Sequence, residues 1–214
     1  MMTTAAVSLA MSPAWADKVP PTTDEVLANY VEIARATYGD SLATAKNLQM
    51  AVDKLIAEPT EANLTAARNA WVAARVPYPQ TEAFRFGNKV VDDWEGKVNS
   101  WPLDEGLIDY VDSSYGTDKP ENPLFVANII ASKSLKIGGE TVDLTTITKE
   151  LLADKLQEAG GVEANVATGY HAIEFLLWGQ DLNGTYAGAG NRPATDFDTK
   201  NCTGGNCDRR ATYL

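Results

Sequence analysis

The sequence predicts an all-α protein, an up-down helical bundle with long irregular loops. In three alanine-rich segments before residue 78, apolar residues recur at helical spacing. Capping residues precede these segments, and proline or glycine follows them. No part of the chain shows a convincing strand-period alternation. Long amphipathic helices with short connections are typical of such a bundle.

Two helices are expected before Pro59, over 22–39 and 42–56. Thr22 and Glu25 form a capping box at the start of the first, and the glycine at its far end is expected to stop it. The proline stops the second helix, because its ring clashes with the preceding turn. A turn near residue 40 is therefore expected between them.

Further helical segments are expected after residue 59, where the spacing of apolar residues becomes less regular. Thr60 can cap a third helix that Pro77 ends. Gly160 and Gly161 are expected to end a helix that Thr148 opens. The remaining expected helical segments are a short helix within 77–87, a turn or two within 98–116, a helix over 122–132, and a helix over 162–178.

The charge of the chain excludes one class of partner. Of the 214 residues, 18 are Lys or Arg and 29 are Asp or Glu, which leaves a net charge of −11. Such a chain repels phosphate backbones, so we expect no nucleic-acid partner. The same charge suits cations, although a solvated acidic surface is the commoner reason for it.

The first residues resemble a secretory signal. An apolar stretch is followed by Ala14-Trp15-Ala16, which fits the small-x-small pattern of a cleavage site. Residues 1–16 are therefore predicted to be a signal peptide. No basic segment precedes the apolar stretch, so we expect this signal peptide to be truncated at its start. The mature chain, 17–214, is then expected in the periplasm or otherwise exported.

Two cysteines lie close together near the end of the chain. Cys202 and Cys207 enclose a loop that contains two glycines. In the oxidising compartment that a signal peptide implies, we expect a disulfide between them. A metal pair is the weaker alternative, and loss of so short a closed loop should cost little stability.

The only histidine of the chain lies in its most apolar helical segment. His171 and Glu174 are three positions apart, so on a helix their side chains share a face. The segment is apolar nearly all round and is expected to be buried, where a carboxylate is costly unless it is paired or bound to a metal. A structural hydrogen bond, a metal site and acid–base catalysis all remain open from this spacing.

Other acidic residues strengthen the metal interpretation. Glu82 in "QTEAF" and Asp104 with Glu105 in "WPLDE" have aromatic and proline neighbours, which suggest shaped, partly buried surroundings. Helical bundles build metal sites from such carboxylates and histidines on facing helices. Each residue alone is as well explained by a surface position, and Asp104 also as the cap of a short helix.

The chain resembles the imelysin-like family, also called the M75 peptidases, and within it the iron-regulated protein A group. The resemblance covers nearly all of the mature chain. Gly169, His171 and Glu174 match the family motif Gly-x-His-x-x-Glu. The other matching segments are "WVAARVPYPQTEAFRFG", "VNSWPLDEGLIDY", "GNRPATDF" and "CDRRATYL".

The resemblance implies a fold of two helical bundles with the motif near a cleft between them. This chain would be the first half, incomplete at its C-terminus, because Asp208 opens a new helix only at the end. The resemblance also implies a role in iron uptake, with a membrane iron-transport component as a partner. His171 and Glu174 are the ligands it favours, and Glu82 and Asp104 are weaker candidates from matching segments.

These observations leave three alternative functions for the chain. One imidazole with several carboxylates suits a metal-binding protein of iron acquisition that carries iron as the ion or a chelate, with zinc able to compete at the histidine. A metallopeptidase of the M75 type is the second, although the zincin motif His-Glu-x-x-His is absent from the sequence. The third is a helical interaction module in which the His–Glu pair is purely structural.

Overall fold

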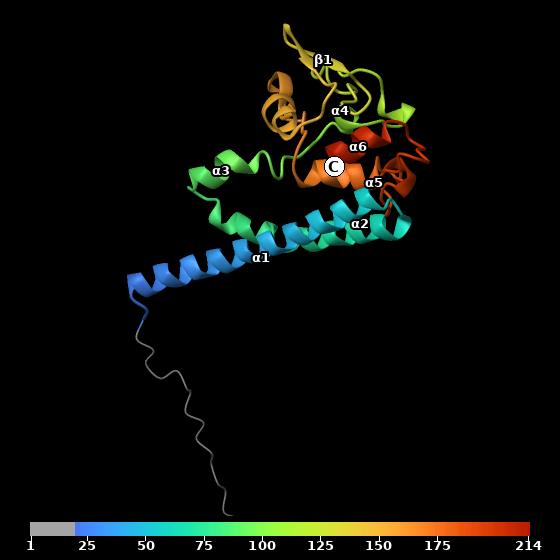
Figure 1. The fold of residues 1–214 in the computed structure, drawn as a ribbon. Helices are drawn as coiled ribbons and strands as arrows, with labels where there is room; N and C mark the ends of the chain where they lie inside the picture. Colours follow the sequence, from blue (N-terminus) through green and yellow to red (C-terminus); the bar gives the residue numbers. More distant parts are fainter. Residues whose placement is uncertain (1–19) are drawn as a thin grey trace, which may run out of the picture.

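A computed structural model describes residues 20–214 of the chain, and it is mainly helical. Its base is an antiparallel pair of helices, α1 (Thr23–Ala57) and α2 (Glu61–Arg75), shown in Figure 1. The Thr22 hydroxyl accepts from the Glu25 amide, and the Glu25 carboxylate accepts from the Thr22 amide, which confirms the capping box. The Thr60 hydroxyl caps α2 in the same way, by accepting from Asn63.

The predicted turn near residue 40 is wrong, because α1 runs through Gly39 without a break. A glycine inside a helix costs only about 1 kcal/mol relative to alanine. Both halves of α1 have packing partners that outweigh this cost. Before the glycine, Tyr30 and Tyr38 lie against the ring of Phe84. After it, Leu48, Val52 and Leu55 are buried in the apolar core that α1 shares with α2.

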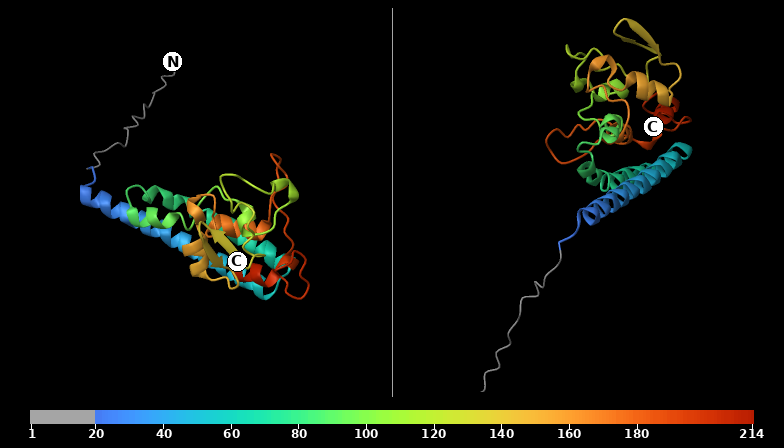
Figure 2. Two further views of the ribbon diagram at one scale, coloured as in Figure 1. Left: turned by 90° about the horizontal axis from the view of Figure 1, so that it is seen from above. Right: turned by 90° about the vertical axis from the view of Figure 1, so that its left-hand side faces the viewer.

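The rest of the chain forms a second layer above the helix pair, which Figure 2 shows from two further sides. The layer is made of short helices and turns joined by long loops, with one small hairpin. Its elements are η1 (Pro79–Phe84), α3 (Lys89–Glu95), α4 (Glu105–Ile108), η2 (Ser113–Tyr115), β1 (Ser134–Ile137), β2 (Glu140–Asp143), η3 (Leu151–Leu156), η4 (Ala159–Gly161), α5 (Tyr170–Trp178), η5 (Ala194–Asp196) and α6 (Cys207–Tyr213).

Two expectations for the middle of the chain are wrong. Residues 122–132 form turns in place of a helix, because their amides bond to carbonyls of α4: Ile129 donates to Leu107 and Ile130 to Ile108. A hairpin, missed from the sequence, follows at once, with β1 antiparallel to β2. Its strands have four residues each, too few to produce a visible alternation.

The helix predicted from Thr148 is present but shorter. Thr148 caps it by accepting from the Leu151 amide, and the bond from Gln157 to Leu152 has the wider spacing of a π-helix. The helix ends at Gln157, whose backbone is extended, and so stops before the glycine pair.

The helix α5 lies on the side of the second layer that faces the helix pair, and it contributes to two apolar cores. Tyr170 and Leu177 belong to an apolar core with α1 and α2. Ala172, Phe175 and Leu176 belong to a second core with α4 and the turns that follow it. The side chains on the remaining face of α5 are therefore fixed by packing on both of its other faces.

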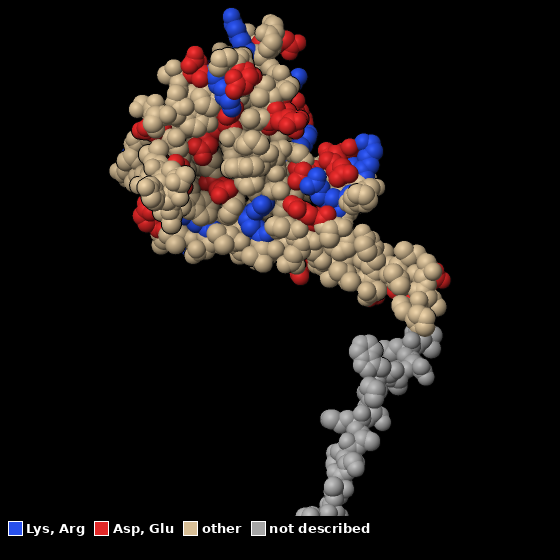
Figure 3. Space-filling view, turned by 180° about the vertical axis from the view of Figure 1, so that it is seen from behind, with Lys and Arg blue, Asp and Glu red and all other residues tan. Residues whose placement is uncertain are grey.

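No helix within residues 20–214 is long and apolar enough to cross a membrane. The predicted signal peptide lies outside the described residues. The N-terminal part of α1 extends beyond the second layer as an arm whose visible surface carries few charges (Figure 3). Its large exposed apolar side chains are Val26, Leu27, Tyr30, Val31 and Ile33.

Candidate metal-binding site

The glycine of the motif begins the helix that carries the histidine. Gly169 precedes α5 with φ 90° and ψ −171°, a conformation open almost only to glycine. A Cβ built there would lie 2.6 Å from the carbonyl carbon of Val98, so the two backbones touch. The Tyr170 amide donates to the Val98 carbonyl at this contact. The helix expected over 162–178 therefore begins only at Tyr170.

His171 and Glu174 meet on one face of α5, as their spacing predicts. Nδ1 of His171 lies 2.9 Å from Oε2 of Glu174. With the proton on Nδ1, the carboxylate orients the ring, and Nε2 keeps a lone pair for a ligand. The His171 side chain is 14% exposed and that of Glu174 40%. The expectation that Glu174 is buried is thus wrong, and burial cost does not explain its presence.

An exposed tryptophan covers the histidine. The rings of Trp101 and His171 have centroids 4.8 Å apart and planes at 52°. The chain before Trp101 is fastened to the start of α5, since the Thr168 hydroxyl donates to the Lys97 carbonyl. The chain after it is fixed by the bond from the Asp104 amide to the Ala164 carbonyl. The backbone that carries Trp101 is therefore fixed on both sides, and the indole lies against the imidazole.

The carboxyl group of Glu105 lies near the carboxylates of Glu174 and Asp181. Burial in the first place, and then the negative charges of Asp181 and Glu174, raise the pKa of Glu105 from 4.5 to about 7, while Arg192 opposes the shift. Glu105 begins α4 and so brings a second element to the site. The sequence grouped Glu105 with Asp104, and its position next to Glu174 became visible only in the fold.

The raised pKa of Glu105 predicts a pH-dependent stability. The folded state holds a proton that the unfolded state releases between pH 4.5 and about 7. The free energy of unfolding should therefore fall as pH rises through this window, by about 1–2 kcal/mol after solvent screening. Urea titrations of wild type and Glu105→Gln should show this difference growing with pH. A constant difference would contradict it, and Glu140→Gln, on the exposed hairpin, is the control.

The two weaker candidate ligands lie in other surroundings. Asp104 is buried, and its carboxylate accepts from Asn122 at 2.6 Å and pairs with Lys119 at 3.2 Å. Asp104 is the N-cap residue of α4, as the alternative expected, but its side chain makes no capping bond to the helix. Glu82 is exposed on η1. Within residues 20–214, no three or more His, Cys, Asp or Glu side chains gather closely enough to hold a metal ion.

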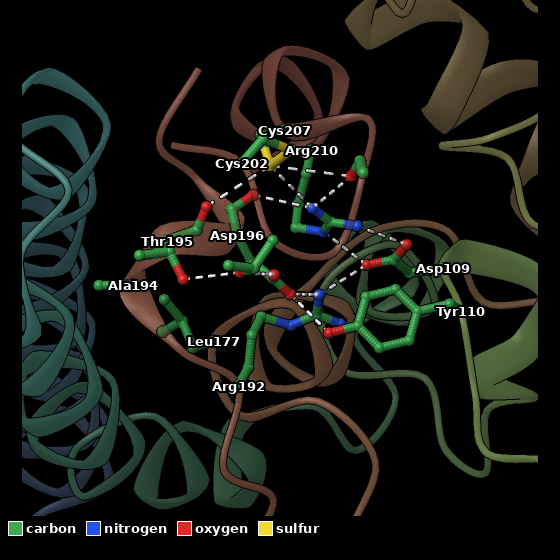
Figure 4. Close-up of polar contacts among 12 residues, drawn as sticks. Asp109, Tyr110, Leu177, Arg192, Ala194, Thr195, Asp196, Cys202, Cys207 and Arg210 are labelled. Carbon is green, nitrogen blue, oxygen red and sulfur yellow. Dashed lines mark hydrogen bonds and ion pairs between the residues drawn. A yellow bond between two sulfur atoms is a disulfide. The ribbon is translucent and has the colours of Figure 1, made fainter. Parts of the chain in front are cut away.

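The expected disulfide between Cys202 and Cys207 is present. It closes a loop over a buried ion network, which Figure 4 shows. Arg210 donates to both oxygens of Asp109, at 2.6 and 3.0 Å, and Arg192 lies 2.8 Å from the same carboxylate. The Asp196 carboxylate pairs with Arg192 and accepts a hydrogen bond from the Tyr110 hydroxyl. Arg210 also donates to the backbone carbonyls of Asp196 and Gly205.

This ion network contacts the helix α5, which carries the site, through Arg192. The Arg192 amide donates to the Trp178 carbonyl at the end of α5, and its guanidinium lies 5.6 Å from the ring centroid of Phe175. The helix α6, expected to begin at Asp208, begins one residue earlier after Asn206. Its Tyr213 is buried and donates to the Ala167 carbonyl, so the last helix packs against the segment that leads into the motif.

Comparison of the sequence with known proteins identifies its family. The family model described as imelysin, peptidase M75, matches residues 34–214. The chain belongs to the imelysin family. Iron-regulated protein A of Synechococcus elongatus is 36% identical over 87 residues, which are 40% of this chain and 24% of that protein. The match therefore spans about a quarter of that relative. In this imelysin, Gly169 precedes α5, His171 lies against the ring of Trp101, and Glu174 lies near enough to Glu105 to raise its pKa.

Proposed function

We propose that this imelysin binds a metal ion, iron in the first place and zinc as a competitor, through His171 and Glu174. The observation that carries the proposal is the hydrogen-bonded pair on α5, with the imidazole oriented by a half-exposed carboxylate. Imidazole and carboxylate together suit iron and zinc. Glu105 and Asp181 add negative charge that favours a cation at this position.

The role of that metal is proposed from the relative and the sequence. The related protein is named as iron-regulated, which supports iron acquisition as the setting. The signal-like residues 1–16 support an exported, periplasmic location, with a membrane iron-transport component receiving the cargo. Asp104 and Glu82 would join the site only if Asp104 left Lys119 and if η1 approached α5.

The first test is calorimetric titration of ferrous, ferric and zinc ions into the full chain at one pH. His171→Ala and Glu174→Ala should each weaken binding by more than about tenfold, because each removes a ligand or the group that orients it. Glu140→Ala, which removes an exposed acid on the hairpin, should leave the affinity unchanged. Equal affinities in all four proteins would contradict the metal site and favour a purely structural His–Glu pair.

One observation favours hydrolysis as a second function. A carboxyl with a pKa of about 7 in a half-buried position is suited to general acid–base catalysis near neutral pH. Glu105 could then act as the base while Glu174 holds or orients the metal ligand. Peptide cleavage that disappears in Glu105→Gln, with zinc affinity retained, would support the peptidase. Cleavage that is unchanged in this variant would exclude Glu105 as the base.

A further inference from the structure

We propose that Trp101 is a recognition residue, and that the site takes its metal as a cationic complex with a planar aromatic chelator in preference to the hydrated ion. The inference rests on the proposed metal site at His171 and Glu174. It adds the chemical class of the ligand that accompanies the metal. Three features of the described residues carry it: the exposure of the indole, its fixed position, and the charge around it.

The indole of Trp101 is 68% exposed, although its ring lies against His171. Packing on the histidine uses only part of its surface, so the remainder is open to solvent beside the ligating side chain. Large apolar groups exposed next to polar, ligand-holding groups are typical of binding sites. A planar ring bound to the same metal as His171 would have this exposed aromatic surface beside it.

The backbone that carries the indole is also preorganised in the absence of a ligand. Hydrogen bonds fix the chain on both sides of it: Thr168 to the Lys97 carbonyl, the Ser100 hydroxyl to the Gly96 carbonyl, and the Asp104 amide to the Ala164 carbonyl. A side chain whose backbone is already fixed loses less conformational freedom on binding. Stacking can therefore contribute most of its free energy to affinity.

The charge of the site selects among metal complexes. Glu174 and Asp181 both lie close enough to Glu105 for their negative charges to act on it. They would repel a metal held by a polycarboxylate chelator and attract a complex that keeps a net positive charge. A neutral bidentate aromatic chelator offers a planar ring to Trp101 and keeps the complex cationic. It also leaves coordination positions open for His171 and Glu174.

The test compares two zinc complexes of equal charge and equal donor number. Zinc with one equivalent of phenanthroline presents a planar aromatic ligand, and zinc with one equivalent of ethylenediamine presents an aliphatic one. Wild type should bind the phenanthroline complex roughly three- to tenfold more tightly, the range expected for one aromatic contact. Trp101→Ala should bring this ratio to about one, whatever its effect on the affinity for each complex taken alone. Trp101→Phe, which keeps a ring, should retain part of the preference.

Trp94→Ala is the matched control, since Trp94 is a similarly exposed tryptophan that lines a groove on another side of α5. It should leave the ratio at the wild-type value. A wild-type ratio of one, or a ratio that Trp101→Ala does not change, would overturn the inference while the metal site stands. Zinc affinity that does not depend on His171 would overturn the metal site, and the inference with it.

Discussion

Replacing Asp109 with alanine should lower the free energy of unfolding by about 3–5 kcal/mol, because it leaves two guanidinium groups buried without their shared carboxylate. The side chains of Arg192 and Arg210 have no exposed surface, and Asp109 is only 2% exposed. A typical domain has a total stability of only about 5–15 kcal/mol. The variant should therefore unfold at a much lower urea concentration, measured by tryptophan fluorescence.

The control for this prediction is an ion pair of the same residue types at the surface. Asp92 lies 3.5 Å from Arg85 with about half of its side chain exposed, so Asp92→Ala should change stability by about 0–1 kcal/mol. The double variant Asp109→Ala with Arg210→Met should recover part of the loss, since it removes one stranded charge. Asp109→Ala that is as stable as Asp92→Ala would show that water reaches the network and that it carries little stability.

Replacing Gly169 with alanine should cost about 3 kcal/mol or more and should also weaken zinc binding. The backbone conformation there disfavours any side chain by about 1–3 kcal/mol, and the new methyl group would collide with Val98. Either the start of α5 or the 97–101 segment must move, so the relation between His171 and Trp101 changes. Urea unfolding and zinc titration of the same variant measure both effects.

Gly139→Ala provides the matched control for this substitution. Gly139 lies in the hairpin turn, where a built Cβ meets no atom within 4 Å and where φ is not positive. The change should alter stability by less than about 0.5 kcal/mol and leave zinc affinity unchanged. If Gly169→Ala behaved like this control, the close contact between Gly169 and Val98 would not be what positions the histidine.

The sequence by itself determined the parts of the protein that depend on neighbouring residues. The caps of Thr22 and Thr60, the pairing of His171 with Glu174 and the disulfide all join residues within five positions of one another. Their geometry is set by one helical turn or one short loop, so spacing and residue type suffice to predict them. The mainly helical class and the family followed from the same local patterns together with the matching segments.

Only the tertiary structure decided which distant residues join the motif. The helix over 162–178 was shortened because Gly169 touches Val98, about 70 positions earlier, and residues 122–132 were held in turns by the carbonyls of α4. For the same reason Trp101 and Glu105 reached the site while Asp104 turned to Lys119. The adjacent residues Asp104 and Glu105 face different neighbours. Which neighbours they face depends on the free energy of long-range contacts, which no local sequence pattern encodes.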